Sequence, residues 1–240
     1  MCGRYTRHHD TAAVTARFGV QHTLFDEAPR FNIAPTQPVA VVVTDHRDRS
    51  RVLDAFRWGL VPSWAKDVSI GSRMINARSE SVAEKPAFKR LLAHRRCVLP
   101  ADGFYEWDKA GGTRQPYLFR RADGDLLGFA GLWDDWLSPD GSSLLTCTIL
   151  TTAANDTVGA IHDRMPVILR RGSGGEDLWL DPSVTRTDAL LPLLLPYPDA
   201  EMERIAVSRR VNTPTNDDAG LLEPSTVAES ARLQYEAGEV

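Results

Sequence analysis

The sequence predicts a single α+β domain with a curved, mainly antiparallel, barrel-like β core and short flanking helices. Short β-rich segments recur along the chain and are separated by turn signals such as KAGGT, ADGD and SPDG, a spacing typical of antiparallel strands. Few segments have a helical pattern. The 240 residues contain neither an internal repeat nor an interdomain linker, and this length is enough to bury one large core.

The first hundred residues predict two helices and two strands. TAAVTARFGV (11–20) has the pattern of a short amphipathic helix. PVAVVVT (38–44) is a β-branched run that predicts a strand, and RVLDAFRWG (51–59) follows it after the polar turn DHRDRS. VAEKPAFKRLLAHR (82–95) predicts a helix that begins around Pro86.

Two segments of this region are expected to be loops. APRFNIAPTQP (28–38) is interrupted by Pro residues. WGLVPSWAKDVSIGSRMINARSE (58–80) is long and rich in Trp, Gly, Ser and Pro. Long loops in compact domains are often functional, so we expect the second loop to contribute to a site.

Strands dominate the remainder of the chain. The predicted strands are RCVLPADGFYEWDK, QPYLFRR, LLGFAGLWDDW, LLTCTILTTAA, VILRRG (167–172) and MERIAVS (202–208). Short helices are expected over GEDLWLD and VTRTDALLPLLL. The domain is expected to span residues 1–224, and the acidic, polar residues 225–240 to form a flexible tail.

Composition excludes several classes of protein. No apolar run approaches the roughly 18 residues of a membrane helix, and no secretory signal pattern opens the chain. We therefore expect no membrane association and a cytoplasmic protein.

Three cysteines are too few for a disulfide framework, and Cys97 and Cys147 lie in apolar, strand-like segments typical of inert buried thiols.

Metal and nucleotide cofactors are not expected. The HHD at 8–10 places two histidines side by side, but no third ligand follows at a recognised spacing. No Gly-rich phosphate loop follows a predicted strand. The sequence therefore predicts no metal and no cofactor.

Charge is distributed unevenly along the chain. The net charge is −4, which argues against a generic nucleic-acid binder. Residues 1–100, however, contain 16 Lys and Arg against 9 Asp and Glu, a net charge of +7, and residues 101–240 are correspondingly acidic. The basic first part can form either a phosphate-binding face or an ordinary solvated surface.

Cys2, in MCGRY, is the most informative residue for chemistry. Removal of Met1 would leave an α-amine and a thiol on adjacent carbons, and an α-amine has a pKa of about 7.7–8.0. Such a pair can form an imine with an aldehyde and then close a five-membered thiazolidine, because ring closure is intramolecular. The thiol can alternatively attack a carbonyl with the amine as base, as in N-terminal nucleophile hydrolases.

Other residues suit the proton transfers and contacts that this chemistry needs. Glu106 is flanked by aromatic residues in PADGFYEW, and His162 precedes a Pro in AIHDRMP. Asn76 and Arg78 lie in the long loop, where an amide and a guanidinium can contact an oxyanion or a phosphate. For Glu106 or His162 alone a structural role is the better interpretation, and for Asn76 and Arg78 it is at least as good. The aromatic residues can stack on bases or form core: Trp58, Trp64, Phe104, Tyr105 and Trp107.

The motifs taken in order resemble the SOS response-associated peptidase family. The matching segments are MCGRY, FNIAPTQ, WGLVPSWAK, INARSES, PADGFYEW, TTAAN, IHDRMPVIL and VNTPTNDDAGLLEP. They run from residue 2 to about residue 224. One motif alone would be weak, whereas this ordered set is specific.

The resemblance implies a sensor of abasic sites that shields them in single-stranded DNA, also near junctions with duplex. It implies that Cys2, freed of Met1 by autoproteolytic processing, forms a slowly reversible thiazolidine with the ring-opened abasic sugar. By the same resemblance Asn76 positions the reacting groups, Glu106 assists proton transfer, and His162 acts as acid and base. The implied DNA contacts are Arg4, Trp64, Arg78 and Arg164, with the 66–74 loop beside Trp64.

Two alternatives remain open at this point. A thiol peptidase acting on other proteins would use the same Cys2, Glu106 and His162. A passive module for single-stranded DNA would need Cys2 only for packing. In each case we expect a monomer, which would be nucleoid-associated when bound to DNA.

Overall fold

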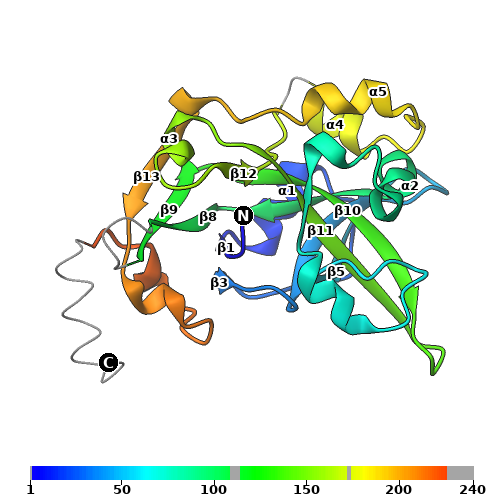
Figure 1. Ribbon diagram of the computed structural model, residues 1–240, viewed down its shortest axis with the longest axis horizontal. Coiled ribbons are helices and arrows are strands. Elements are labelled where there is room, and N and C mark those ends of the chain that lie inside the picture. The colour runs from blue at the N-terminus through cyan, green and yellow to red at the C-terminus, as the bar shows by residue number, and fades with distance from the viewer. Residues whose placement is uncertain (1, 109–113, 172–173, 226–240) are drawn as a thin grey trace.

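The computed structural model describes residues 2–108, 114–171 and 174–225 (Figure 1). Strands form two sheets, and short helices lie around them. The strands are β1 (Tyr5–Arg7), β2 (His22–Thr23), β3 (Arg30–Ile33), β4 (Pro38–Thr44), β5 (Arg51–Trp58), β6 (Asn76–Arg78), β7 (Arg96–Ala101), β8 (Gly103–Asp108), β9 (Gln115–Arg121), β10 (Leu127–Leu137), β11 (Ser143–Ala153), β12 (Arg164–Pro166) and β13 (Met202–Ala206). The α-helices are α1 (Thr11–Phe18), α2 (Pro86–His94), α3 (Asp156–Gly159), α4 (Gly175–Leu180) and α5 (Thr187–Leu190).

Five strands of the larger sheet close into a barrel. The sheet has the order β12-β11-β10-β7-β4-β5-β2, and β11 also pairs with β5, so that β11, β10, β7, β4 and β5 form a ring. The closing pair is parallel, with Cys147 opposite Trp58, and the other pairs in the ring are antiparallel. This architecture confirms the predicted α+β domain with a barrel-like β core.

Successive side chains of β4 point alternately to the inside and the outside of the barrel wall. Val39 and Val41 belong to a core cluster with side chains from all four other barrel strands, which is the barrel interior. Ala40 and Val42 belong to a second cluster, which includes residues of α1, α2 and α4. The period of two follows from the pleat of a strand, and it lets β4 bury apolar side chains on both faces.

The second sheet brings the N-terminus of the chain to the barrel. Its order is β13-β9-β8-β1-β3, and in β1 Tyr5 lies opposite Phe104 of β8 and Ile33 of β3. One residue before β1, the carbonyl of Arg4 accepts the N–H of Tyr105 at 3.0 Å. Cys2 therefore lies beside the end of β8, and Figure 1 shows the N-terminal end near that strand in the middle of the view.

The predicted helices are confirmed with their local signals. The Asp10 side chain accepts the N–H of Ala13 at the start of α1, and the helix ends at Gly19, whose φ of 62° is the left-handed conformation that glycine favours. Helix α2 begins at Pro86, where its missing N–H costs nothing.

Three short strands differ from the sequence prediction. The loop predicted over 28–38 contains β3, and the loop over 58–80 contains β6 together with the 3-10 helix η1 (Val68–Arg73). The strand predicted over 167–172 is wrong, because the strand β12 lies just before it. Val167 donates its N–H to Leu150 of β11 and Leu169 donates to Gly128 of β10, so this segment crosses from one strand to the next instead of pairing along either.

Two further expectations concern the chain as a whole. The predicted tail, residues 225–240, lies outside the described residues except for Ser225. Within the described ranges, the structure contains no helix long and apolar enough to cross a membrane.

Candidate active site at the N-terminus

Cys2 is completely buried at the edge of the barrel interior. Burial is the largest cause that raises the pKa of its thiol, and the negative charge of Glu106 raises it further. The Sγ atom lies 3.8 Å from the carbonyl of Arg4. The thiol is therefore protonated at neutral pH, and a base must remove its proton before it can act as a nucleophile.

Asn76 contacts the Cys2 main chain directly. It lies in β6, which pairs in parallel with β11 so that Asn76 is opposite Ile149. Its Nδ2 donates to the carbonyl of Cys2 at 2.7 Å. Its Oδ1 is buried and has no hydrogen-bond partner among the described residues, so it is an acceptor that another group can use.

Glu106 approaches Cys2 from the second sheet. It lies in β8 opposite Tyr117 of β9, and it is only 4% exposed. Because the N–H of Tyr105 donates to the carbonyl of Arg4, the next residue, Glu106, lies beside the first residues of the chain. Its charge is close enough to act on the Cys2 thiol, so the structure brings a carboxylate and an amide to the same cysteine.

His162 lies in the turn after α3, and its ring is largely buried. Its Nδ1 accepts the backbone N–H of Arg164 at 3.0 Å and also lies 3.0 Å from the carboxylate of Asp163. In a neutral ring the first contact leaves the proton on Nε2, and in a charged ring Nδ1 can donate to Asp163 instead. Ile161, the preceding residue, packs against the core cluster that contains Cys2.

The three arginines predicted to contact DNA have different surroundings. Arg4 donates from one nitrogen to Asn32 and to the carbonyl of Val211, both at 2.7 Å, and burial lowers its pKa from the usual value. Arg164 forms a two-pronged ion pair with Glu80 at 2.6 and 2.9 Å.

Arg78 differs from these two arginines. It ends β6 opposite Thr151 of β11, whose carbonyl accepts from Arg164. Its side chain is exposed. Thus Asn76 and Arg78 of β6 and Arg164 of β12 all lie beside one stretch of β11, residues 149–153.

Trp64 lies on the exposed part of the long loop, with 64% of its surface accessible. The loop is fixed at its base by two glycines in close contact. A Cβ on Gly59 would lie 2.7 Å from the carbonyl oxygen of Gly71, and a Cβ on Gly71 would lie 2.6 Å from that of Gly59. Only glycines allow this approach, so the loop presents Trp64 on a fixed base.

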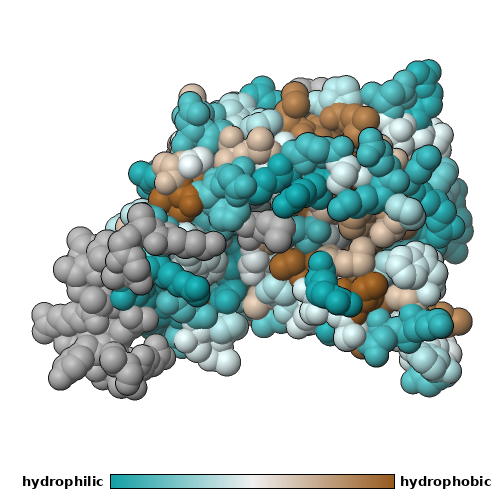
Figure 2. Space-filling view, viewed as in Figure 1, coloured by the Kyte–Doolittle hydropathy of each residue, from teal (hydrophilic) through white to brown (hydrophobic). Residues whose placement is uncertain are grey.

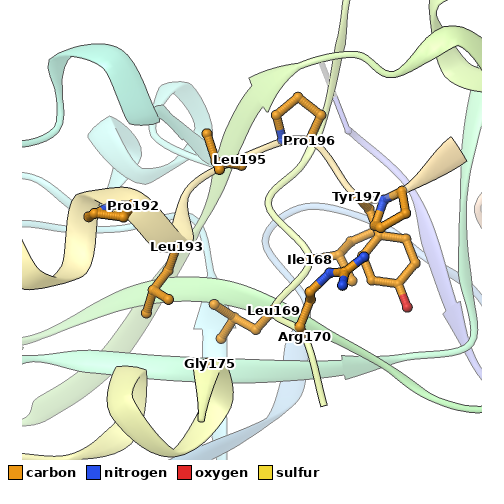
Figure 3. A pocket seen from close by; sticks show the side chains of 10 residues that line it. Ile168, Leu169, Arg170, Gly175, Pro192, Leu193, Leu195, Pro196 and Tyr197 are labelled. Atoms are coloured by element: carbon orange, nitrogen blue, oxygen red, sulfur yellow. The ribbon is translucent and has the colours of Figure 1, made fainter. Parts of the chain in front are cut away.

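One pocket of the described structure is not lined by Cys2. A pocket of about 210 Å³ lies between the segment Ile168–Arg170 and the proline-rich segment Pro192–Pro198 (Figure 3). None of the predicted site residues lines it. On the face seen in Figure 2, hydrophobic residues form small separate areas among hydrophilic ones.

Sequence reasoning missed the partners of the site residues. Asn32 is fully buried and joins Arg4 to the C-terminal part of the chain, and Glu80 pairs with Arg164. Asn32 and Glu80 lie inside the motifs FNIAPTQ and INARSES. Their position in these motifs was a signal, but residue type alone does not reveal a partner far along the chain.

The five-stranded barrel, with Cys2 buried beside the Asn76 amide and the Glu106 carboxylate, defines a class of α+β protein whose candidate site lies at the start of the chain. Residues 1–214 match the family model described as SOS response associated peptidase (SRAP). The chain therefore belongs to the SOS response associated peptidase family, as its motifs predict.

Individual relatives agree with this assignment. The abasic site processing protein YoqW of Bacillus subtilis (strain 168) is 41% identical over 226 residues, which cover 93% of this chain and 99% of the relative. The abasic site processing protein HMCES of Gallus gallus is 36% identical and covers 82% of this chain and 66% of the relative.

Solved structures agree on the fold. A protein from Bordetella bronchiseptica is 30% identical with a TM-score of 0.74, covering 86% of this chain and all of that one. A protein from Bacteroides thetaiotaomicron is similar in fold alone, with a TM-score of 0.82 at 24% identity over 94% of this chain and all of that one.

Proposed function

We propose that this protein senses abasic sites in single-stranded DNA and shields them by a covalent thiazolidine bond through Cys2, once Met1 has been removed. The observation that carries the proposal is the meeting of Asn76 and Glu106 at a buried Cys2. The names of the relatives YoqW and HMCES, both abasic site processing proteins, support the substrate.

The proposed reaction has two bond-forming steps. The Cys2 α-amine adds to the aldehyde of the ring-opened sugar, and loss of water gives an imine. The Cys2 thiol then adds to the imine carbon, so that one C–S bond forms, the thiol proton leaves sulfur and the nitrogen gains a proton. The net reaction releases one water, and intramolecular closure makes the second step fast.

The buried residues supply the proton transfers. Because burial keeps the Cys2 thiol protonated, Glu106 is the base that accepts its proton and passes it to nitrogen. Asn76 holds the Cys2 carbonyl, and its free Oδ1 can accept from the α-amine. His162 donates a proton to the hydroxyl that leaves as water when the imine forms. The reverse proton transfer allows slow hydrolysis of the crosslink and release of the DNA.

The proposed contacts are mainly with the phosphate backbone of the DNA. Exposed Arg78 contacts phosphate, Arg4 and Arg164 contribute their remaining N–H groups, and Trp64 stacks on a base where single strand meets duplex. Such contacts carry little sequence preference, and affinity should fall as salt increases.

The test uses purified protein shown to begin at Cys2 and a single-stranded oligonucleotide with one abasic site. We expect a conjugate that survives heating in denaturant, that is absent in Cys2→Ala and in protein retaining Met1, and that persists in the control Cys147→Ala, which alters another buried thiol. No conjugate from the parent protein would contradict the proposal. Catalytic turnover of peptides would favour a thiol peptidase, and binding of undamaged DNA without a conjugate would favour a passive module.

A further inference from the structure

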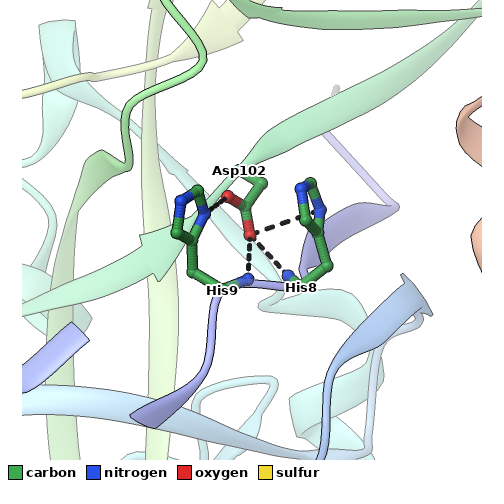
Figure 4. A group of neighbouring side chains, drawn as sticks. All are labelled: His8, His9 and Asp102. Carbon is green, nitrogen blue, oxygen red and sulfur yellow. Dashed lines mark hydrogen bonds and ion pairs between the residues drawn. The ribbon is translucent and has the colours of Figure 1, made fainter. Parts of the chain in front are cut away.

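Two histidines and an aspartate meet at the end of β1, outside the Cys2 site (Figure 4). His8 and His9 follow β1 directly, and Asp102 lies in the bend between β7 and β8. One ligand atom from each residue lies within 4.8 Å of the other two. The sequence predicted no metal because the histidine pair lacks a third ligand nearby, and the fold supplies that ligand from 93 residues along the chain.

The spacing of these atoms suits a small cation. His8 Nδ1 lies 3.4 Å from Asp102 Oδ2, and ligand atoms of a tetrahedral site with bonds of about 2.0 Å lie about 3.3 Å apart. His9 Nδ1 contacts the other carboxylate oxygen as a hydrogen bond. A cation would replace the shared proton, which passes to solvent, and the two atoms would separate slightly to bind it. In Figure 4 the two rings flank the carboxylate.

The three side chains are already oriented. The Asp102 side chain is only 3% exposed, and its Oδ2 accepts the backbone N–H groups of both His8 and His9. The His8 ring stacks on Phe31, with centroids 5.8 Å apart and planes 5° from parallel. Ligands fixed by a second set of contacts bind metal more tightly, because less order is lost on binding.

The cluster is also open to solvent on one side. The His8 and His9 side chains are 32% and 36% exposed, so an ion can enter and water can complete its coordination. Two imidazoles and one carboxylate suit divalent ions of the zinc and cobalt type, whereas calcium and magnesium prefer oxygen ligands alone.

We propose that His8, His9 and Asp102 form a binding site for one divalent transition-metal ion such as Zn²⁺ or Co²⁺. The ion joins the turn between β1 and α1 to the bend between β7 and β8. Because this arrangement exists only in the folded chain, the ion stabilises the fold, and above its Kd the stabilisation increases with the logarithm of the ion concentration.

The test titrates the chelator-treated full-length protein with Co²⁺, followed by calorimetry and visible absorption, and with Zn²⁺, followed by thermal unfolding. We expect one ion per chain, the absorption of four-coordinate Co²⁺, and a midpoint that increases with Zn²⁺. His8→Gln and His9→Gln should each weaken binding by at least the roughly 10–100-fold that loss of a supporting contact costs. His46→Gln and His94→Gln alter exposed histidines outside the cluster and should bind like the parent.

The proposal is overturned if the parent binds no Co²⁺, or if the double variant His8→Gln/His9→Gln binds as the parent does. Loss of the Co²⁺ spectrum in Cys2→Ala, with the histidine variants unaffected, would assign the ion to the thiol instead. Asp102 is left intact because its carboxylate also caps two backbone N–H groups. Urea unfolding without metal verifies that each histidine variant is folded.

Discussion

At the residue scale, the three arginines proposed to contact DNA differ in what already binds them. Arg164 is paired with Glu80, and its side chain is 13% exposed. Arg4 is bound by Asn32 and a main-chain carbonyl. Arg78 is exposed at the end of β6, so a phosphate can reach it without displacing a carboxylate. Arg78 should therefore contribute most of the salt-dependent affinity of the three.

We predict that Arg78→Gln weakens binding of undamaged single-stranded DNA several-fold and reduces the slope of log affinity against log salt by about 0.7. The control Arg47→Gln removes the same charge from the turn between β4 and β5, where the side chain is 90% exposed, and should leave the slope unchanged. Fluorescence anisotropy over a range of salt concentrations measures both. A larger slope change in Arg164→Gln than in Arg78→Gln would contradict this ranking.

At the element scale, the sequence predicted those helices and strands whose own residues carry a signal, such as a capping residue or a β-branched run. Helix α1 has a capping Asp10 and a terminal Gly19, and β4 is a β-branched run. The short strands β3, β6 and β12 have no such pattern, because each forms by pairing with another strand: β3 with β1, and β6 and β12 with β11.

The candidate site divides in the same way. The ordered motifs named Cys2, Asn76 and Glu106 as candidates, and the fold places these three residues together. Partners that lie far apart in the sequence are visible only when the chain is folded: Asn32 binds Arg4, and Asp102 contacts His9 outside the Cys2 site.

The contact between Gly59 and Gly71 gives a prediction for the loop that carries Trp64. Gly71→Ala would place a methyl group 2.6 Å from a backbone oxygen, which cannot move as a side chain can. We expect a loss of about 1–3 kcal/mol in the free energy of unfolding, measured by urea denaturation. Gly159→Ala is the control, since its methyl group would meet its nearest neighbour at 3.9 Å. Equal unfolding midpoints in both variants would show that the loop base tolerates the methyl group.

At the scale of the whole molecule, buried acidic groups make the fold sensitive to alkaline pH. Cys97 and Cys147 are fully buried, and burial raises the pKa of each thiol above its usual range. Above about pH 9 the unfolded chain loses these protons while the folded chain retains them. The unfolded state is therefore favoured as pH increases, and stability is lost in that direction.

We predict that each buried thiol reduces the free energy of unfolding by roughly 1.4 kcal/mol per pH unit above its ordinary pKa. Cys147→Ala should make the decline between pH 9 and pH 10 shallower by about that amount, as measured by urea unfolding at each pH. A decline as steep as that of the parent would mean that the thiol ionises in the folded protein.

The central claim is that both the nitrogen and the sulfur of Cys2 bond to the abasic sugar. The mass of the conjugate does not test it, because an imine and a thiazolidine both form with loss of one water. The decisive measurement is ¹³C NMR of the conjugate made with an oligonucleotide labelled at C1′ of the abasic site, before and after borohydride treatment. We predict a saturated carbon bonded to nitrogen and sulfur that borohydride leaves unchanged. An unsaturated imine carbon that borohydride reduces would contradict the account.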